Sequence, residues 1–343
     1  MRVLISVLLL LSSQSLQAAT EGSLEKGLVN PGYHEKPAWF KTSFLDLGED
    51  VREAAEQDKR VLLYFYQDGC PYCAKLLKDN FGKPEIVEKT RKHFDVIAVN
   101  LWGDREVMDV DGNITTEKQF AESLKVQYTP TLLFLNEQGQ PVARLNGYYE
   151  PRKFDVVLDY VAGRHESRMN LSAYYAQRIK ATAGSPLHDE PFFLAHPLQL
   201  VDNRKHSWRQ LLVLFEERGC QPCNDLHEDS FKRESLVMAL SAFDIAQVDM
   251  RSSQQLQTPD GRKLSASQWA AELGLQYAPS LVFFDADGNE VFRSEAWLKA
   301  FHLHAVLDYV ATGAYRHQPN FQRFVQHRAD MLRAKGFDVD LMR

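Results

Sequence analysis

Cysteine is scarce in this chain of 343 residues, and its placement limits what the few cysteines can do. All four belong to two motifs, C-P-Y-C at residues 70–73 and C-Q-P-C at residues 220–223. A structural disulfide framework uses wider, scattered spacings. Zinc ribbons place their two pairs roughly 15–20 residues apart, so a four-cysteine zinc site is only a minor alternative for pairs this distant. The two isolated pairs therefore favour redox-active dithiols.

The chain also lacks features that mark two other functional classes. Its net charge is −6 and it has no basic run of five or six residues, which argues against nucleic acid as a partner. Its 11 histidines are scattered, and none forms a metal-binding spacing such as H-E-x-x-H. We therefore predict no metal site, and we expect His34, His227 and His317 to be surface residues.

Long apolar runs are absent after the first residues, and the run at the start is short. Arg2 precedes an apolar stretch over residues 3–11 and small residues at 17–19, which is the pattern of a secretory signal peptide. The stretch is about half the roughly 20 residues that a membrane span needs, so a membrane anchor is the weaker alternative. We expect residues 1–19 to be a cleaved signal peptide and the mature protein to be periplasmic.

Each cysteine pair follows a short apolar run, at residues 61–65 and 211–215, and precedes a segment with helical periodicity. A strand that turns into a helix at a C-x-x-C is typical of a thiol redox site. The first cysteine then lies at the helix N-terminus, where unpaired N–H groups favour the attacking thiolate. Cys70 and Cys220 are the predicted nucleophiles, and Cys73 and Cys223 are the thiols that close the disulfides.

The two halves of the chain repeat one another at an offset of 149 or 150 residues. The segment V-L-D-Y-V-A recurs letter for letter at 157–162 and 306–311, and the capping-box signatures at 116–119 and 265–268 match. We infer a tandem duplication. The predicted parts are a domain over residues 37–165, a helical linker over 166–185, a second domain over 186–314 and a C-terminal helical extension over 315–343.

Within the first half, the hydrophobic patterns predict a series of elements that the second half repeats. Helices are expected at 49–57, after Cys73, from Pro84, from residue 116 to 124 and at 155–162; strands are expected at 61–66, 95–100, 132–135 and 142–145. Residues 170–182 are predicted to form a further helix outside the core. The order indicates an α/β fold with a central mixed sheet flanked by helices in each domain.

Two prolines at matched positions, Pro130 and Pro279, each open a strand about 60 residues after the first cysteine of their half. A trans proline that only opens a strand is the simpler interpretation. The position resembles the one where thioredoxin folds hold a cis proline opposite the C-x-x-C, and its occurrence in both halves favours the cis bond. A cis bond frees the backbone of the preceding residue, Thr129 or Ala278, to pair with an extended substrate chain. Tyr72 is a candidate for lining the same groove, and a solvent-facing position is its alternative.

The first half resembles the periplasmic SoxW-type thioredoxin family over about residues 39–162. The motifs that carry the resemblance are W-F-K-T-S-F-L-D-L at 39–47, Q-D-G-C-P-Y-C at 67–73, N-L-W-G-D-R-E-V at 100–107 and T-P-T-L-L-F-L at 129–135. The second half is similar to the same family more loosely. The resemblance implies two tandem thioredoxin-like domains, thiol–disulfide exchange outside the cytoplasm, and no cofactor besides the redox-active disulfides. It also implies a membrane thiol-electron donor of the DsbD or CcdA kind.

The chain departs from the thioredoxin pattern where proton transfer is concerned. Thioredoxin has a buried acid six residues before its first cysteine, and this chain has Tyr64 and Leu214 there. Proton transfer must therefore use water or another group.

The two dithiols are also expected to differ in redox potential. The dipeptide P-Y of the first pair resembles that of glutaredoxin, whereas Q-P of the second is closer to that of thioredoxin. Near Cys220, Arg218 should favour the thiolate, and Glu216 and Glu217 should oppose it. Unequal potentials would allow one site to pass electrons to the other.

The sequence supports a thiol–disulfide oxidoreductase that reduces protein disulfides bound along the proline strand. A disulfide isomerase is the second enzyme hypothesis, since two catalytic domains on one chain suit that activity. The non-enzyme hypothesis is a chaperone or scaffold that binds client proteins and uses its cysteines only as structural disulfides.

Overall fold

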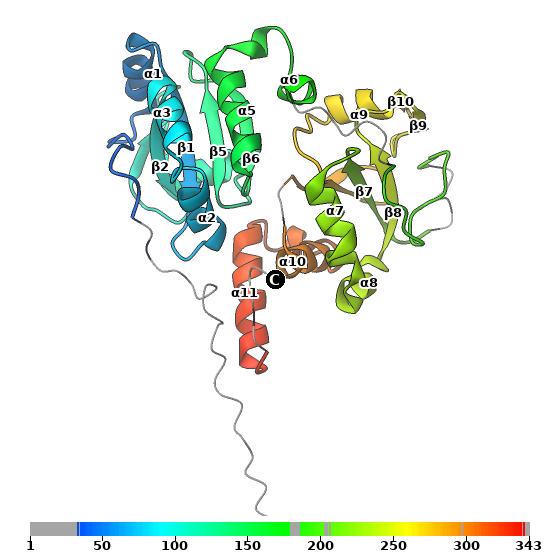
Figure 1. Ribbon diagram of the computed structural model, residues 1–343. Helices are drawn as coiled ribbons and strands as arrows, with labels where there is room; N and C mark the ends of the chain where they lie inside the picture. The colour runs from blue at the N-terminus through cyan, green and yellow to red at the C-terminus, as the bar shows by residue number, and fades with distance from the viewer. Residues whose placement is uncertain are drawn as a thin grey trace, which may run out of the picture.

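The structure, a computed structural model, describes residues 33, 35–178, 186–201, 205, 207–295, 298–337 and 339. The predicted signal peptide at 1–19 lies outside the described residues. The described chain forms two α/β units in sequence, each built on a four-stranded mixed sheet with helices packed on it (Figure 1). The predicted fold of each half is therefore confirmed.

The first sheet has the strand order β2-β1-β5-β6. Its central strand β1 pairs in parallel with β2 and antiparallel with β5, which in turn pairs antiparallel with β6. The elements of this half are α1 (Leu47–Glu56), β1 (Arg60–Tyr66), α2 (Pro71–Asp79), α3 (Pro84–His93), β2 (Phe94–Asn100), β3 (Glu106–Met108), β4 (Ile114–Thr116), α4 (Glu117–Ser123), β5 (Thr131–Leu135), β6 (Pro141–Asn146), α5 (Pro151–Ala162), η1 (His165–Ser167) and α6 (Leu171–Arg178).

The second sheet repeats this topology in the order β8-β7-β11-β12. The central strand β7 pairs in parallel with β8 and antiparallel with β11. The elements of this half are β7 (Gln210–Glu216), α7 (Gln221–Glu228), η3 (Ser230–Lys232), α8 (Glu234–Leu240), β8 (Phe243–Asp249), β9 (Gln255–Gln257), β10 (Lys263–Ser265), α9 (Ala266–Glu272), β11 (Ser280–Phe284), β12 (Glu290–Ser294), α10 (Ala300–Ala311), η4 (Ala314–Arg316) and α11 (Phe321–Ala334).

The central strands are apolar on both faces because helices cover both faces of each sheet. Along β1, Leu62 and Tyr64 belong to the cluster under α2, α3 and α5, whereas Leu63 and Phe65 belong to the cluster under α1 and α4. Side chains alternate between the two faces of a strand, so a strand with helices on both sides reads as a continuous apolar run. Burial on both faces fixes the position of β1 within the sheet. It therefore also fixes the position of the cysteine turn that follows β1.

Helix starts follow the sequence signals closely. Thr116 accepts a hydrogen bond from the backbone N–H of Gln119, whose side chain accepts one from the Thr116 N–H in return. Ser265 and Gln268 form the same reciprocal pair at the start of α9. Pro84 occupies the first turn of α3, where a missing N–H costs little. These caps confirm the predicted helix starts.

Three features differ from the sequence predictions. The polar segment after β2 contains the hairpin β3–β4, which has a counterpart in β9–β10. The strands of these two hairpins have three residues each, which is too short for the sequence to show an alternation of apolar and polar residues. The helix predicted over 170–182 is described as Leu171–Arg178 and is not outside the core, because Leu171 and Tyr174 are buried in the first cluster. Residues 186–201 contain no α-helical counterpart of α1.

Each half sends its trailing helix onto the other half. In α6, the Ser172 carbonyl accepts a hydrogen bond from Arg251 of the second half at 2.8 Å. In α11, the Gln322 side chain donates to the carbonyl of Gln127 of the first half at 2.9 Å. Figure 1 shows α11 running beside the end of the first domain that carries α2. The trailing helix of each half is therefore packed on its own core and also contacts the other half.

Two tyrosines at equivalent repeat positions add further contacts between the halves. Tyr128 is buried in the aromatic cluster of the second half, with its ring centroid 5.5 Å from that of Phe321. Tyr277, 149 residues later, is buried in the cluster of the first half, 4.7 Å from the ring centroid of Tyr149. Each tyrosine lies two residues before a matched proline, so the interface buries the proline-bearing face of each domain.

In the described part of the chain, no helix is both long and apolar enough to span a membrane.

Candidate active site

Each leading cysteine is the N-cap of the helix that follows it. The Sγ of Cys70 accepts a hydrogen bond from the backbone N–H of Cys73 at 3.0 Å, and Cys220 accepts one from Cys223 at 3.2 Å. A strand, a tight turn and a proline in the first helical turn produce this arrangement in both halves. A sulfur at this position faces the unpaired N–H groups of the helix, which stabilise negative charge. Both leading cysteines are therefore placed to act as thiolates.

The cysteines of each pair form a disulfide, with Cα atoms 5.2 Å apart in both. The matched prolines lie opposite. The Thr129–Pro130 and Ala278–Pro279 peptide bonds are cis, as the sequence suggested, and a third cis bond at His196–Pro197 was not foreseen.

The sulfur of each leading cysteine lies beside the carbonyl that precedes the cis proline. The Sγ of Cys70 is 3.3 Å from the Thr129 oxygen, and the Sγ of Cys220 is 3.4 Å from the Ala278 oxygen. A substrate backbone that pairs with this segment would reach the attacking sulfur. The structure thus brings together the cysteines, the prolines and the residues that precede them; their binding roles stay predictions.

Both leading cysteines are buried, and the opposite domain lines the cleft beside the first of them. Cys70 is only 2% exposed and Cys220 is 9% exposed. A cleft of about 610 Å³ borders Cys70, and both domains form its walls. The second domain contributes residues of α10 and α11 to this wall, among them His302, Gln322, Arg323 and Val325. A folded protein substrate therefore cannot reach the first site unless the domains move apart or only an extended segment enters.

Tyr72 is part of this wall. It is buried, its hydroxyl accepts a hydrogen bond from the backbone N–H of Lys299 at 3.3 Å, and its ring lies 5.2 Å from that of His302. The solvent-facing alternative for Tyr72 is therefore wrong.

The second motif borders a different cavity. A smaller cavity of about 180 Å³ lies between Pro222 of the second motif and Lys75 of α2, and Tyr148, Glu150, Lys153 and Tyr277 complete its lining. The ammonium group of Lys153 lies 5.2 Å from the Tyr277 ring centroid. Burial lowers the pKa of Lys153 and raises the pKa of Tyr277 well above its ordinary value. This cavity connects the helices that carry the two cysteine motifs.

The charged side chains near Cys220 are not arranged as the sequence suggested. Arg218 forms an ion pair with Asp249 at 3.0 Å and is half-exposed. Glu217 pairs with Arg251 at 2.7 Å. Glu216 is fully buried in a polar cluster next to the cysteine helix. Arg218 and Glu217 are therefore each paired with an opposite charge. This pairing weakens the effects that the sequence predicted for them on the Cys220 thiolate.

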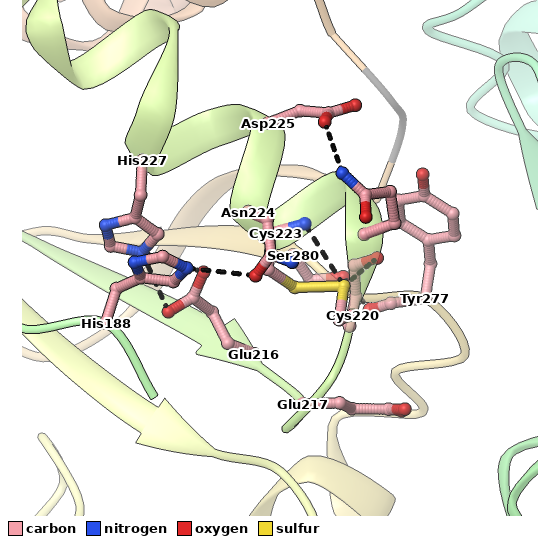
Figure 2. The surroundings of a disulfide bond; sticks show 12 residues. His188, Glu216, Glu217, Cys220, Cys223, Asn224, Asp225, His227, Tyr277 and Ser280 are labelled. Atoms are coloured by element: carbon pink, nitrogen blue, oxygen red, sulfur yellow. Dashed lines mark hydrogen bonds and ion pairs between the residues drawn. A yellow bond between two sulfur atoms is a disulfide. The ribbon is translucent and has the colours of Figure 1, made fainter. Parts of the chain in front are cut away.

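The cluster around Glu216 was missed from the sequence. Of the three histidines predicted at the surface, His34 lies outside the described residues and His317 is exposed. His227 is only 1% exposed, so the prediction for it is wrong. Its ring nitrogens lie 3.0 Å from Glu190 and 3.1 Å from Glu216. Figure 2 shows the contact with Glu216. The sequence does contain an indication of this position. His227 follows Cys223 by four residues, so the two side chains lie on the same face of the helix.

The first site has an apolar cluster at the corresponding positions. Tyr66, Leu77 and Ala98 occupy the repeat positions of Glu216, His227 and Gln247, and all three pack against the first core. Across the described residues, no group of three or more His, Cys, Asp or Glu side chains is placed to hold a metal ion.

A family model described as the thioredoxin-like domain matches the chain twice, over residues 47–162 and 197–311. The chain belongs to the thioredoxin-like domain family. Its fold is accordingly two tandem thioredoxin-like domains, as the sequence predicted. The two dithiols, each at a helix start on such a domain, support thiol–disulfide oxidoreductase activity.

Two curated relatives are thiol:disulfide interchange proteins DsbD. The protein from Photorhabdus laumondii is 30% identical over 105 residues, and the one from Vibrio cholerae is 30% identical over 111 residues. These matches cover 30% and 32% of this chain but only 16% and 17% of the relatives. This thioredoxin-like chain thus corresponds to a small part of each relative.

Among solved structures, a thioredoxin-fold protein from Helicobacter pylori is 23% identical. The match covers 39% of this chain and 94% of that protein, with a TM-score of 0.31.

Proposed function

We propose that the protein is a periplasmic thiol–disulfide oxidoreductase that reduces protein disulfides at two C-x-x-C sites. The observation that carries this proposal is the placement of each leading sulfur. It caps a helix, accepts an N–H hydrogen bond and lies 3.3 or 3.4 Å from the carbonyl before a cis proline. Such a sulfur is both ionisable and next to a backbone edge for an extended substrate.

The reaction at either site proceeds through a mixed disulfide. The thiolate of Cys70 or Cys220 attacks one sulfur of the substrate disulfide, and the other substrate sulfur leaves as a thiolate that takes up a proton. Cys73 or Cys223 then loses its proton and attacks the leading cysteine, which releases the second substrate sulfur. The substrate gains two electrons, and the cysteine pair is oxidised to a disulfide.

The direction, the location and the donor are parts of the proposal. The signal-peptide pattern at residues 1–19 supports export, and the resemblance to SoxW-type thioredoxins supports reduction rather than oxidation. The curated relatives are interchange proteins of the DsbD kind, which supports a membrane thiol-electron donor of that kind for this chain. Protein disulfides are the proposed substrates.

Insulin reduction with dithiothreitol as electron source tests the proposal. We expect wild type to accelerate the appearance of reduced insulin, the single variants Cys70→Ala and Cys220→Ala each to lose part of the activity, and the double variant to lose all of it. Equal turnover in wild type and the double variant would contradict the proposal and favour a client-binding scaffold with structural disulfides.

A further inference from the structure

A buried polar cluster lies against the resolving cysteine of the second site. It contains His227, Glu216 and Glu190, with Gln247 donating to Glu216 at 2.7 Å. His188 stacks on His227 with ring centroids 4.5 Å apart and hydrogen-bonds to Asn224 at 2.9 Å. Figure 2 shows His188, His227 and Glu216 on the Cys223 side of the disulfide. Buried charges are costly unless they are paired, so a cluster of this kind needs an explanation.

The position of His227 relative to Cys223 follows from helix geometry. The two residues are four apart in α7, and both are buried against the sheet. Side chains at this spacing lie one above the other, with Cβ atoms about 5–6 Å apart. A charge on His227 therefore acts on the Cys223 sulfur at short range and through a medium that screens it little.

The groups that face His227 favour its charged form. Burial disfavours the imidazolium, but hydrogen bonds and charges from Glu216 and Glu190 outweigh burial and raise the pKa of His227 above its ordinary value. Glu216 comes from β7 and Glu190 from the segment before it, and Lys232 of η3 lies 3.4 Å from Glu190. The other contacts are the rings of His188, Phe193 and Phe231.

The charges in the cluster are balanced only with His227. Two carboxylates, Glu216 and Glu190, face one imidazolium and one ammonium, that of the largely exposed Lys232. If His227 is replaced by a neutral residue, uncompensated negative charge remains beside Cys223. A like charge nearby disfavours a thiolate.

The first domain provides an internal comparison. At the equivalent positions it has Leu77 for His227 and Tyr66 for Glu216, in an apolar cluster beside Cys73. Neither domain has an acid six residues before its first cysteine, since Tyr64 and Leu214 stand there. At these two positions the second domain therefore has ionisable side chains in contact with each other, whereas the first has a leucine and a tyrosine whose ring centroid lies 3.6 Å from the Lys36 ammonium.

We propose that His227, held as an imidazolium between Glu216 and Glu190, is a positioning residue that stabilises the Cys223 thiolate and so sets the pH range in which the second site resolves its mixed disulfides. This proposal rests on the proposed function. In the step concerned, Cys223 loses its proton and attacks the Cys220 sulfur. The Cys220–substrate bond breaks, the Cys220–Cys223 bond forms, and the substrate leaves as a thiolate.

The test separates attack from resolution by using 5,5′-dithiobis(2-nitrobenzoate) as the disulfide. The background variant carries Cys70→Ala and Cys73→Ala, so that only the second site reacts. Attack by reduced Cys220 releases one nitrothiobenzoate, and attack by Cys223 on the mixed disulfide releases a second. The rate of the second release is measured between pH 5 and pH 10 with His227 intact and with His227→Gln.

We expect His227→Gln to move the midpoint of the resolution rate upward by about one pH unit or more, with about tenfold slower resolution below the midpoint. The first release should remain, and far-UV circular dichroism should be unchanged. Superimposable resolution profiles in the two proteins would overturn the proposal. His227→Leu, which installs the first-domain residue, is the second variant and should shift the midpoint in the same direction.

The matched control is Leu77→Gln in a Cys220→Ala, Cys223→Ala background. This substitution changes the packing under the first site without changing a charge, so its resolution profile should match that of its parent. A comparable shift there would show that packing, rather than the charge of His227, moves the midpoint. Loss of the first release in the second-site parent would instead contradict the proposed function itself, which keeps the two failures distinct.

Discussion

Tyr128 offers the most direct test of the closed domain arrangement. Its ring belongs to the first domain by sequence but is buried among second-domain aromatics, including Phe321 of α11. Its hydroxyl donates to the carbonyl of Arg293 at 3.3 Å. Because α11 also walls the cleft beside Cys70, loosening this contact should expose the first site. We therefore expect Tyr128→Ala to raise the reactivity of reduced Cys70.

The expected size of the effect follows from the burial of the ring. Removing a buried aromatic side chain costs about 3–5 kcal/mol. If about 3 kcal/mol of that is lost from the interface, the open population rises roughly a hundredfold, since each 1.4 kcal/mol is a factor of ten. Tyr128→Phe keeps the ring and loses only the hydroxyl hydrogen bond, about 1 kcal/mol, so it should raise the open population by no more than about tenfold.

Alkylation of the reduced protein by iodoacetamide measures this population. In a Cys220→Ala, Cys223→Ala background, the Cys70 alkylation rate should increase in the order wild type, Tyr128→Phe, Tyr128→Ala. The reciprocal variant Tyr277→Ala, in a Cys70→Ala, Cys73→Ala background, should raise the rate at Cys220. Unchanged rates in both alanine variants, with both proteins folded, would refute the idea that the domain interface controls access to the sulfurs.

Two further predictions concern stability and are measured by urea unfolding. Hydrogen bonds from Arg60 lower the pKa of Glu137 to about 2, so this carboxylate stabilises the fold above the ordinary glutamate pKa and loses that contribution as the pH falls toward 2. Glu137→Gln should cost about 2 kcal/mol at pH 7 and progressively less below pH 4.5; an equal cost at pH 7 and pH 2.5 would contradict the assignment. Thr116→Ala and Ser265→Ala each remove half of a capping box and should each cost about 1 kcal/mol, whereas a cost below about 0.3 kcal/mol in both would show that the boxes do not stabilise their helices.

Local signals in the sequence were sufficient for most of the fold. The central strands are continuous apolar runs, and the capping boxes at Thr116 and Ser265 place helix starts to the residue. The cysteine turns were equally clear, because a strand, a C-x-x-C and a helix occur in that order in both halves. The duplication strengthened each of these inferences, since a signal that occurs twice at a fixed offset is unlikely to arise by coincidence.

The parts that could not be predicted depend on contacts between distant segments. The covering of Cys70 by α11 joins residues more than 200 positions apart, and local periodicity carries no information about it. His227 looked like a surface residue because its partners Glu190 and Glu216 lie 37 and 11 residues away. A buried charge can be recognised from sequence only when its counter-charges are known to converge on it.

The repeat explains how two similar sites on one chain can come to differ without disturbing the fold. Position 77 and its counterpart 227 each follow the resolving cysteine by four residues on the same helix face, where the first domain has a partly buried leucine and the second a buried, paired histidine. A neutral side chain at this position adds no charge to the partial positive charge of the helix N-terminus that stabilises the resolving thiolate. An imidazolium at this position adds a cation within one helical turn of that thiolate. A substitution at this one position therefore acts on the resolving thiol and not on the N-cap geometry of the leading sulfur, which is the same in both domains.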